Sequence, residues 1–270
     1  MIGAALIEWA VTAHHQLALG DELDSLITFC GPFAILIAAL WVMYIALEPY
    51  VRRFWPDSLL GWSRLLAGHI KDPRVGRDVL VGCCGGLVLA FVELGKLTLL
   101  PMLGYPAPRP WFGLVTLTLS GLGSVVFSWI AWMLSAAEGA LVTVLIIVML
   151  RLALRRITLA LMVTSVIVSV AFVQYMMDTG WVGLLFPLTN GVLFTLIAFR
   201  FGLLPLVVTR FVYSVVVRVP IVLGVSEWAA APGLWTMGAL LVLTVCAFVA
   251  SRAGQPLFGS WLDDRTPARA

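Results

Sequence analysis

Polar side chains that interrupt long apolar runs are the first candidates for chemistry in this sequence. Glu93 and Lys96 are three residues apart, which places them on one face of a helix. Asn190 lies in a second apolar run, and Arg210 and Arg218 lie in a third. Inside a membrane, such groups form ion pairs, proton sites or sites for anionic lipid. The alternatives are structural, because long side chains also reach back to the interface and an asparagine in a kinked helix bonds to a neighbour.

No set of groups for hydrolysis or phosphoryl transfer can be assembled from the residues. The three histidines, His14, His15 and His69, lie in polar stretches, which argues against a metalloprotease or a rhomboid-type serine protease within the membrane. The four cysteines lie in apolar runs without a CxxC pair or a histidine at zinc spacing. The sequence also has no P-loop. We therefore expect no catalytic residues, no metal and no cofactor.

A second group of candidate residues lies in the one long polar stretch, residues 48–78. Six of the 17 basic residues fall between Arg52 and Arg77, interspersed with tryptophans. That density is too low for nucleic acid, and the mixture is typical of a short amphipathic helix at a membrane surface. We expect the arginines to contact anionic headgroups and the tryptophans to lie at the interface. The candidate residues for this surface or for a partner are Arg52, Arg53, Trp55, Trp62, Arg64 and Arg77.

The composition determines which fold positions these residues. Of the 270 residues, 61% are hydrophobic and 11% are charged, whereas soluble domains carry about 25% charged residues. So few charges exclude a soluble globular protein, and so high a hydrophobicity excludes a disordered chain. The sequence predicts an all-α, polytopic membrane bundle of about seven spans, with six to eight as the range.

The expected organisation follows the apolar runs along the chain. Residues 1–24 form a truncated apolar segment and a polar turn, residues 25–250 form the transmembrane domain with its interfacial loop at 48–78, and residues 251–270 form a polar tail. Residues 201–222 hold Arg210 and Arg218, so we expect a re-entrant or interfacial segment there, with a tilted span as the alternative. The predicted spans are 25–47, 79–100, 111–134, 136–154, 157–177, 181–199 and 228–250.

The distribution of basic residues predicts the orientation. Short cytoplasmic loops are rich in arginine and lysine, so the loop at 48–78 is expected in the cytoplasm. Simple alternation of the predicted spans then places Arg151, Arg155 and Arg156 on the opposite side, which the same rule disfavours. Either one span is wrongly placed or the early loop dominates the orientation.

Three segments of the polar loop also carry a resemblance to a known family. EPYVRRFWP (48–56), GWSRLLAG (61–68) and DPRVGRDVLVG (72–82) resemble the C-terminal membrane region of bacterial serine/threonine protein kinases of the acidobacterial type. The two histidines at 14–15 and AGQPLFG (253–259) fit the same pattern. The resemblance implies a multi-pass protein of the bacterial inner membrane and a cytoplasmic kinase domain before the first span. This chain has no Gly-rich loop, HRD or DFG motif, so it cannot transfer phosphate by the kinase mechanism.

Two functional classes follow from these observations. The first is a non-catalytic module that anchors a serine/threonine-kinase-type signalling protein in the membrane and senses a signal. The second is a small transporter or permease, which is expected to show inverted repeats and polar groups at mid-membrane. The sequence shows no repeat, which favours the first class. The expected partners are the lipid bilayer, through anionic headgroups, and a cytoplasmic kinase domain or signalling partner; nucleic acid is not expected, and an oligomer is compatible with the sequence.

Overall fold

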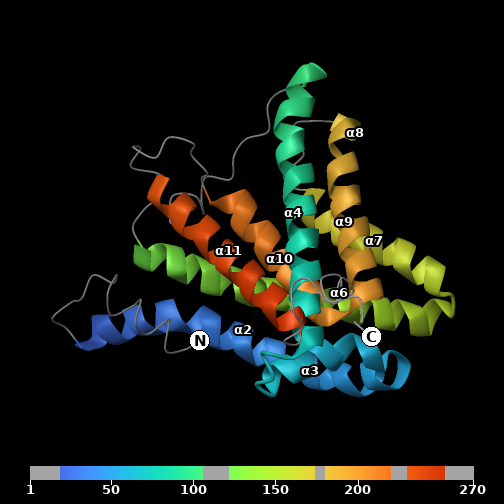
Figure 1. Ribbon diagram of the computed structural model, residues 1–270, viewed down its shortest axis with the longest axis horizontal. Helices are drawn as coiled ribbons and strands as arrows, with labels where there is room; N and C mark the ends of the chain where they lie inside the picture. Colours follow the sequence, from blue (N-terminus) through green and yellow to red (C-terminus); the bar gives the residue numbers. More distant parts are fainter. Residues whose placement is uncertain (1–18, 106–121, 174–179, 220–229, 253–270) are drawn as a thin grey trace, which may run out of the picture.

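A computed structural model describes residues 19–105, 122–173, 180–219 and 230–252 (Figure 1). Within those ranges the chain is helical apart from short turns, and it contains no strand. The N-terminal segment up to residue 18 with its two histidines, the first part of the span predicted at 111–134, and the tail beyond residue 252 lie outside the described residues.

The described helices follow most of the predicted spans closely. Helices α2, α4, α7, α9 and α11 lie where spans 25–47, 79–100, 157–177, 181–199 and 228–250 were expected. The elements are α2 (Leu19–Phe54), the 3-10 helix η1 (Pro56–Leu59), α3 (Leu60–Leu66), α4 (Pro73–Met102), α6 (Leu122–Leu154), α7 (Ile157–Val173), α8 (Gly180–Gly183), α9 (Leu185–Phe201), α10 (Leu203–Arg218) and α11 (Ala230–Ser251).

Several of these helices are those of a membrane protein. Four are long and apolar enough to cross a bilayer, at Leu26–Val51, Pro73–Met102, Gly123–Leu154 and Ala231–Ser251. Two shorter apolar helices cover Ile157–Val170 and Leu185–Phe201. The expected all-helical fold is therefore confirmed for the described residues, with four helices that could span a membrane, and the count of seven spans stays a prediction.

Helix α4 begins earlier than the apolar run alone predicted. Its N-cap is Asp72, whose Oδ1 accepts a hydrogen bond of 2.8 Å from the backbone N–H of Arg74. Pro73 occupies the first turn, where its missing N–H removes no helical hydrogen bond. These two residues start the helix inside the polar stretch. The loop expected at 48–78 is thus partly helical, because it contains the end of α2, η1, α3 and the start of α4.

Helix α10 is the central element of the bundle. It packs most extensively against α4 and also against α6 and α9 (Figure 1), and nearly all its side chains from Leu203 to Val216 are buried. An interfacial helix would leave one face exposed, so the interfacial alternative for residues 201–222 is wrong for the described part of that segment. A re-entrant segment and a tilted span both remain compatible with an internal helix.

Two glycines of α4 allow α10 to approach this closely. A Cβ added at Gly82 would lie 2.5 Å from the Cβ of Val208, and one added at Gly86 would lie 2.6 Å from the Cβ of Val212. The spacing of four residues repeats the contact one turn further along. This GxxxG pair is therefore a packing surface between two parallel helices.

Helix α6 corrects the sequence prediction for residues 122–154. It is one continuous helix of 33 residues, whereas two spans were predicted at 111–134 and 136–154. The prediction left only Ser135 between the two spans, and a single residue cannot turn the chain between two antiparallel helices. Polar side chains are accommodated within the helix, as where Thr143 Oγ1 donates to the backbone oxygen of Gly139 at 2.7 Å.

Because α6 is one helix, the arginines of the loop at 48–78 and those at 151–156 lie at the same end of the bundle. Trp55, Arg151, Arg155 and Phe199 line the same pocket, which shows that α2, α6 and α9 all end there and that α7 begins there. A Cβ added at Gly202 would lie 2.6 Å from the backbone oxygen of Ser58, so α10 begins at the same place. We call this the basic end.

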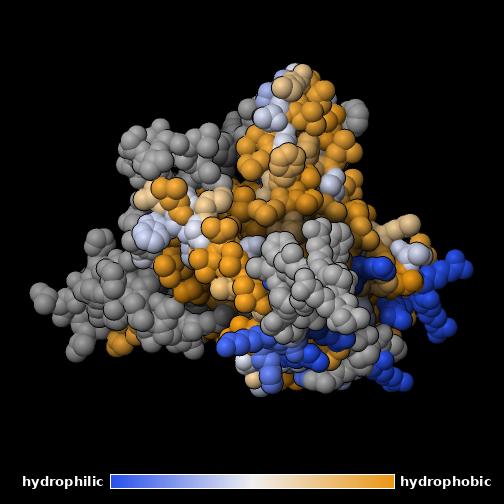
Figure 2. Space-filling model, viewed as in Figure 1, coloured by the Kyte–Doolittle hydropathy of each residue, from blue (hydrophilic) through white to orange (hydrophobic). Residues whose placement is uncertain are grey.

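The basic end holds most of the described cationic side chains. Figure 2 shows the most hydrophilic residues, in dark blue, in the lower part of the view, where α3 and the start of α4 lie. The conflict with the positive-inside rule is removed, because one fewer span lies between the loop and Arg151. The basic residues at this end with described side chains are Arg53, Arg64, Lys71, Arg74, Arg77, Arg151, Arg155, Arg156, Arg200 and Arg252.

Candidate functional site

Three of the polar residues selected from the sequence meet between α4 and α9. Lys96 Nζ is paired with Glu93 Oε1, and the side chains of Lys96 and Glu93 are 8% and 13% exposed. Asn190, which is buried, donates from Nδ2 to Glu93 Oε2 at 3.4 Å. We call these three residues the α4–α9 polar cluster. Its charges neutralise each other, as buried ionic groups require.

The Asn190 side chain gives the cluster an unused acceptor. Asn190 Oδ1 is buried and has no hydrogen-bond partner among the described residues. Pro187 lies in the first turn of α9, where proline breaks no helical hydrogen bond, so the described helix is not broken next to Asn190. At about 1.5 Å per residue, Glu93 lies about 30 Å along α4 from Pro73. The cluster therefore lies about two-thirds of the way along α4 from the basic end.

Arg210 lies apart from this cluster, between α10, α6 and α9. Its guanidinium carbon is 4.9 Å from the ring centroid of Phe194, a cation–π arrangement. The same guanidinium lies directly against Gly139, where any side chain would collide with it. Glu138 is close enough to interact with its charge. These contacts describe a partly buried cation held by a ring, a glycine and a nearby carboxylate.

Arg218 ends helix α10, about two turns after Arg210. Its guanidinium carbon lies 5.8 Å from the ring of Trp132 in α6. The structure thus brings Glu93, Lys96 and Asn190 together and places Arg210 and Arg218 at individual aromatic contacts.

Sequence reasoning missed Glu138, Gly139 and Phe194, which surround Arg210. One signal was present, because Glu138 is the single carboxylate in the apolar run at 136–154. No pattern in the sequence connected it to a residue more than 70 positions away.

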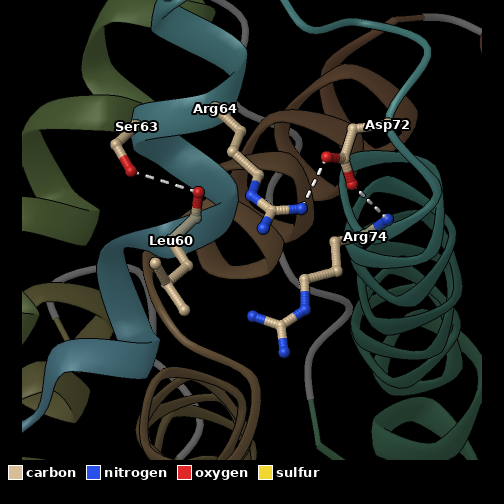
Figure 3. Close-up of polar contacts among 5 residues, drawn as sticks. All are labelled: Leu60, Ser63, Arg64, Asp72 and Arg74. Carbon is tan, nitrogen blue, oxygen red and sulfur yellow. Dashed lines mark hydrogen bonds and ion pairs between the residues drawn. The ribbon is translucent and has the colours of Figure 1, made fainter.

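The loop arginines are held within the protein by carboxylates. Arg64 Nη1 in α3 contacts Asp72 Oδ2 at 2.5 Å (Figure 3), and Arg77 Nη2 contacts Asp78 Oδ1 at 3.1 Å. The pKa of Asp72 lies below its ordinary value, chiefly because the backbone N–H of Arg74 donates to it and also because of Arg64. The Arg64–Asp72 pair attaches α3 to the start of α4, whereas Arg77 and Asp78 are neighbours within α4.

The two loop tryptophans also contact the protein. Trp55 and Trp62 both pack against the hydrophobic core. Arg53 is exposed, and the side chain of Arg52 lies outside the described part of the chain. Contact of the loop residues with anionic headgroups stays a prediction.

Metal binding has no support in the described ranges, where no three His, Cys, Asp or Glu side chains lie close enough together to hold an ion.

Comparison with known proteins adds no identification: no protein-family model, no curated protein and no solved structure matches the chain.

Proposed function

We propose that the chain is a non-catalytic membrane module that anchors a bacterial serine/threonine-kinase-type signalling protein and senses a signal for it. The observation that carries the proposal is the basic end, where the arginine-rich helix ends meet. Basic residues favour the cytoplasmic side of the inner membrane. The face that a cytoplasmic kinase domain would meet is therefore the face on which α3 is held.

Seven of the described helices alternate in direction, which supports seven spans of a different set from the one predicted, because α6 replaces two predicted spans and α10 is added. Helices α2, α6, α9 and α11 run toward the basic end, and α4, α7 and α10 run away from it. The three shortest have 16 or 17 residues, which corresponds to about 25 Å of helix against a hydrocarbon core of about 30 Å. We infer that these three helices cross the membrane although they are short, because they pack among longer helices.

The kinase link rests on the sequence resemblance, and the structure adds where the resembling segments lie. Segments 48–56, 61–68 and 72–82 form the end of α2, α3 and the start of α4. The Arg64–Asp72 pair joins two of them. A surface built from adjacent segments that resemble one family is a suitable docking face for the domain found in that family.

A transporter is the second candidate, and the α4–α9 polar cluster is the observation that favours it. Transport sites use buried polar groups with unused hydrogen-bonding capacity, such as Asn190 Oδ1. Against this, Glu93 and Lys96 neutralise each other, and the cluster lies toward one end of α4 instead of at its centre. The anchoring and sensing function is therefore the better-supported proposal.

Co-purification of kinase activity with the full chain tests the proposal. The tagged chain is isolated from the membranes of its bacterial source, and serine/threonine kinase activity is measured in the eluate. We expect activity with the wild type and a large loss with the double variant Lys71→Glu, Arg74→Glu, which reverses two exposed charges at the basic end. Met102→Glu is the matched control, because Met102 is 83% exposed at the other end of α4.

The same preparation distinguishes the transporter alternative. The purified chain is reconstituted in proteoliposomes, and proton flux is followed with an internal pH-sensitive dye. Flux that is lost in Glu93→Gln, together with no kinase activity in the wild-type eluate, would contradict our proposal and support transport.

A further inference from the structure

A pocket of about 300 Å³ lies at the basic end, outside the polar groups considered so far. It is formed by the residue that follows α2, the last turns of α6, the start of α7 and the last turn of α9. The described ends of four helices therefore contribute to one concave site.

The inner part of this pocket is apolar and aromatic. Ile147 and Val148 of α6 line it and are 1% and 4% exposed. Trp55 and Phe199 form a second side, with ring centroids 5.4 Å apart and planes tilted by 49°. Such a surface suits hydrocarbon and excludes a fully hydrated ion from the base of the pocket.

The outer part of the pocket is cationic. Arg151 and Arg155 both line it, and they are exposed and four residues apart at the end of α6. Arg151 lies in the last turn of α6 and Arg155 directly follows the last residue of that helix. Guanidinium groups bind phosphate through paired, charge-assisted hydrogen bonds.

The backbone of Arg155 has a conformation that other residue types adopt more easily than arginine. Its φ is +53°, in the left-handed region that glycine and asparagine adopt most easily. The chain turns from α6 into α7 at this residue. A strained arginine beside a concave site suggests that its charge is used there.

The position of the pocket relative to the spans indicates which ligand reaches it. Arg151 lies in the last turn of the α6 span, Gly123–Leu154, and Trp55 follows closely on the α2 span, Leu26–Val51. Both spans therefore end at the level of the pocket. This is the level of lipid headgroups on the side of the membrane that the basic end faces.

We propose that this pocket binds the phosphate-bearing headgroup of an anionic membrane lipid. Arg151 and Arg155 contact the phosphate oxygens, and Trp55 and Phe199 contact the glycerol backbone and the first methylene groups. A soluble phosphate ester shares the phosphate chemistry, but it has no apolar part to occupy the inner surface. The proposal does not depend on the kinase link.

Native mass spectrometry of the full chain in detergent tests the proposal with phosphatidylglycerol as the probe. We expect the wild type to retain phosphatidylglycerol in preference to phosphatidylcholine. Arg151 makes a further contact within the protein, so Arg155 is the cleaner position to change. Arg155→Asn keeps a residue that adopts positive φ, and we expect it to weaken retention about tenfold, because charge-assisted bonds are lost.

Two further variants separate a specific pocket from a general charge effect. Leu152→Trp is expected to reduce retention without any change in charge, because Leu152 lines the pocket and is 41% exposed, so a larger side chain there reaches the pocket without filling the core. Arg74→Gln is the control, because Arg74 is an exposed cation at the basic end that does not line the pocket. Equal losses in Arg74→Gln and Arg155→Asn would overturn the proposal.

The source of the phosphate is decided in a second arm. Inorganic phosphate and glycerol 3-phosphate are added without lipid, and the thermal midpoint of the protein is measured. We expect no shift that depends on Arg155. A shift with either soluble compound that Arg155→Asn abolishes would overturn the lipid assignment, and so would equal retention of phosphatidylcholine and phosphatidylglycerol.

Discussion

The Glu93–Lys96 pair is an ion pair inside the described bundle. Both side chains are largely shielded, and Asn190 supplies an additional hydrogen bond to the carboxylate. Removing one partner from a shielded pair leaves an uncompensated charge, which is more harmful than removing both. The pair is therefore expected to matter for stability whether or not it has a second function.

Glu93→Gln is expected to lower the free energy of unfolding by about 3–5 kcal/mol, because Lys96 loses its counter-charge in a buried position. The double variant Glu93→Gln, Lys96→Met is expected to recover most of that loss. Unfolding in mixed detergent and dodecyl sulfate micelles measures both. If the double variant were less stable than Glu93→Gln, the pair would not be the cause.

Asp72 is expected to make stability depend on pH in the acid range. Its pKa in the folded protein lies below the value of 3.8 for an unperturbed carboxyl group, so its stabilising contribution is complete above that value and is lost as pH falls through the lower folded value. Asp72→Asn keeps an N-cap residue but does not titrate. The difference in thermal midpoint between wild type and Asp72→Asn should be constant near neutral pH and shrink below about pH 4. A difference that does not change with pH would contradict this role.

Sequence proximity explains which residue contacts could be predicted. Glu93 and Lys96 belong to one helix, so their spacing alone predicts the pair. The contact of Glu93 with Asn190 and the contact of Arg210 with Phe194 join different helices. No residue spacing determines which faces of two apolar helices meet, because almost every face is hydrophobic.

At the scale of elements, the close contact of α4 with α10 organises the bundle. Gly82 and Gly86 leave room for Val208 and Val212, and Thr209 Oγ1 donates to the backbone oxygen of Gly82 at 3.2 Å. The GxxxG spacing of these two glycines is typical of a packing surface. The partner helix was not predicted, because α10 contains two arginines and was expected at the membrane surface or re-entrant.

Gly86→Ala is expected to destabilise the protein by about 1–3 kcal/mol, because the added methyl group overlaps Val212 and the backbone of α10. Gly95→Ala is the matched control in the same helix, since a Cβ there meets nothing within 4 Å. It should be neutral or stabilise α4 by up to about 1 kcal/mol. Equal effects of the two substitutions on unfolding would show that α10 does not pack on Gly86.

The wrong boundary in α6 has a physical explanation. Ser135, Glu138 and Gly139 lower the local hydropathy, which is also what happens between two spans. In the structure, Gly139 is the residue against which Arg210 packs, and Glu138 lies near that cation. The polar interruption therefore marks an internal contact, and a hydropathy profile does not distinguish such a contact from a loop.

At the scale of the whole molecule, composition was sufficient for the fold class and insufficient for the topology. So few charges leave only a helical membrane bundle, and the described residues are all-helical. The side on which Arg156 lies depends on whether one helix or two spans cover residues 122–154. Only the structure, with its uninterrupted α6, brings that arginine to the same end as the loop.

The single basic end determines the topology of the whole molecule, and cysteine accessibility tests directly whether it exists. Lys71→Cys, Arg156→Cys and Met102→Cys are made separately in a chain whose cysteines, Cys30, Cys83, Cys84 and Cys246, have been replaced. All three positions are exposed. Each variant is treated with a membrane-impermeant maleimide in intact spheroplasts and again after permeabilisation.

We predict that Lys71→Cys and Arg156→Cys react only after permeabilisation and that Met102→Cys reacts in intact spheroplasts. Reaction of Arg156→Cys from the outside, with Lys71→Cys still protected, would contradict the single basic end, because an odd number of spans, such as the three predicted from the sequence, would then separate the two positions.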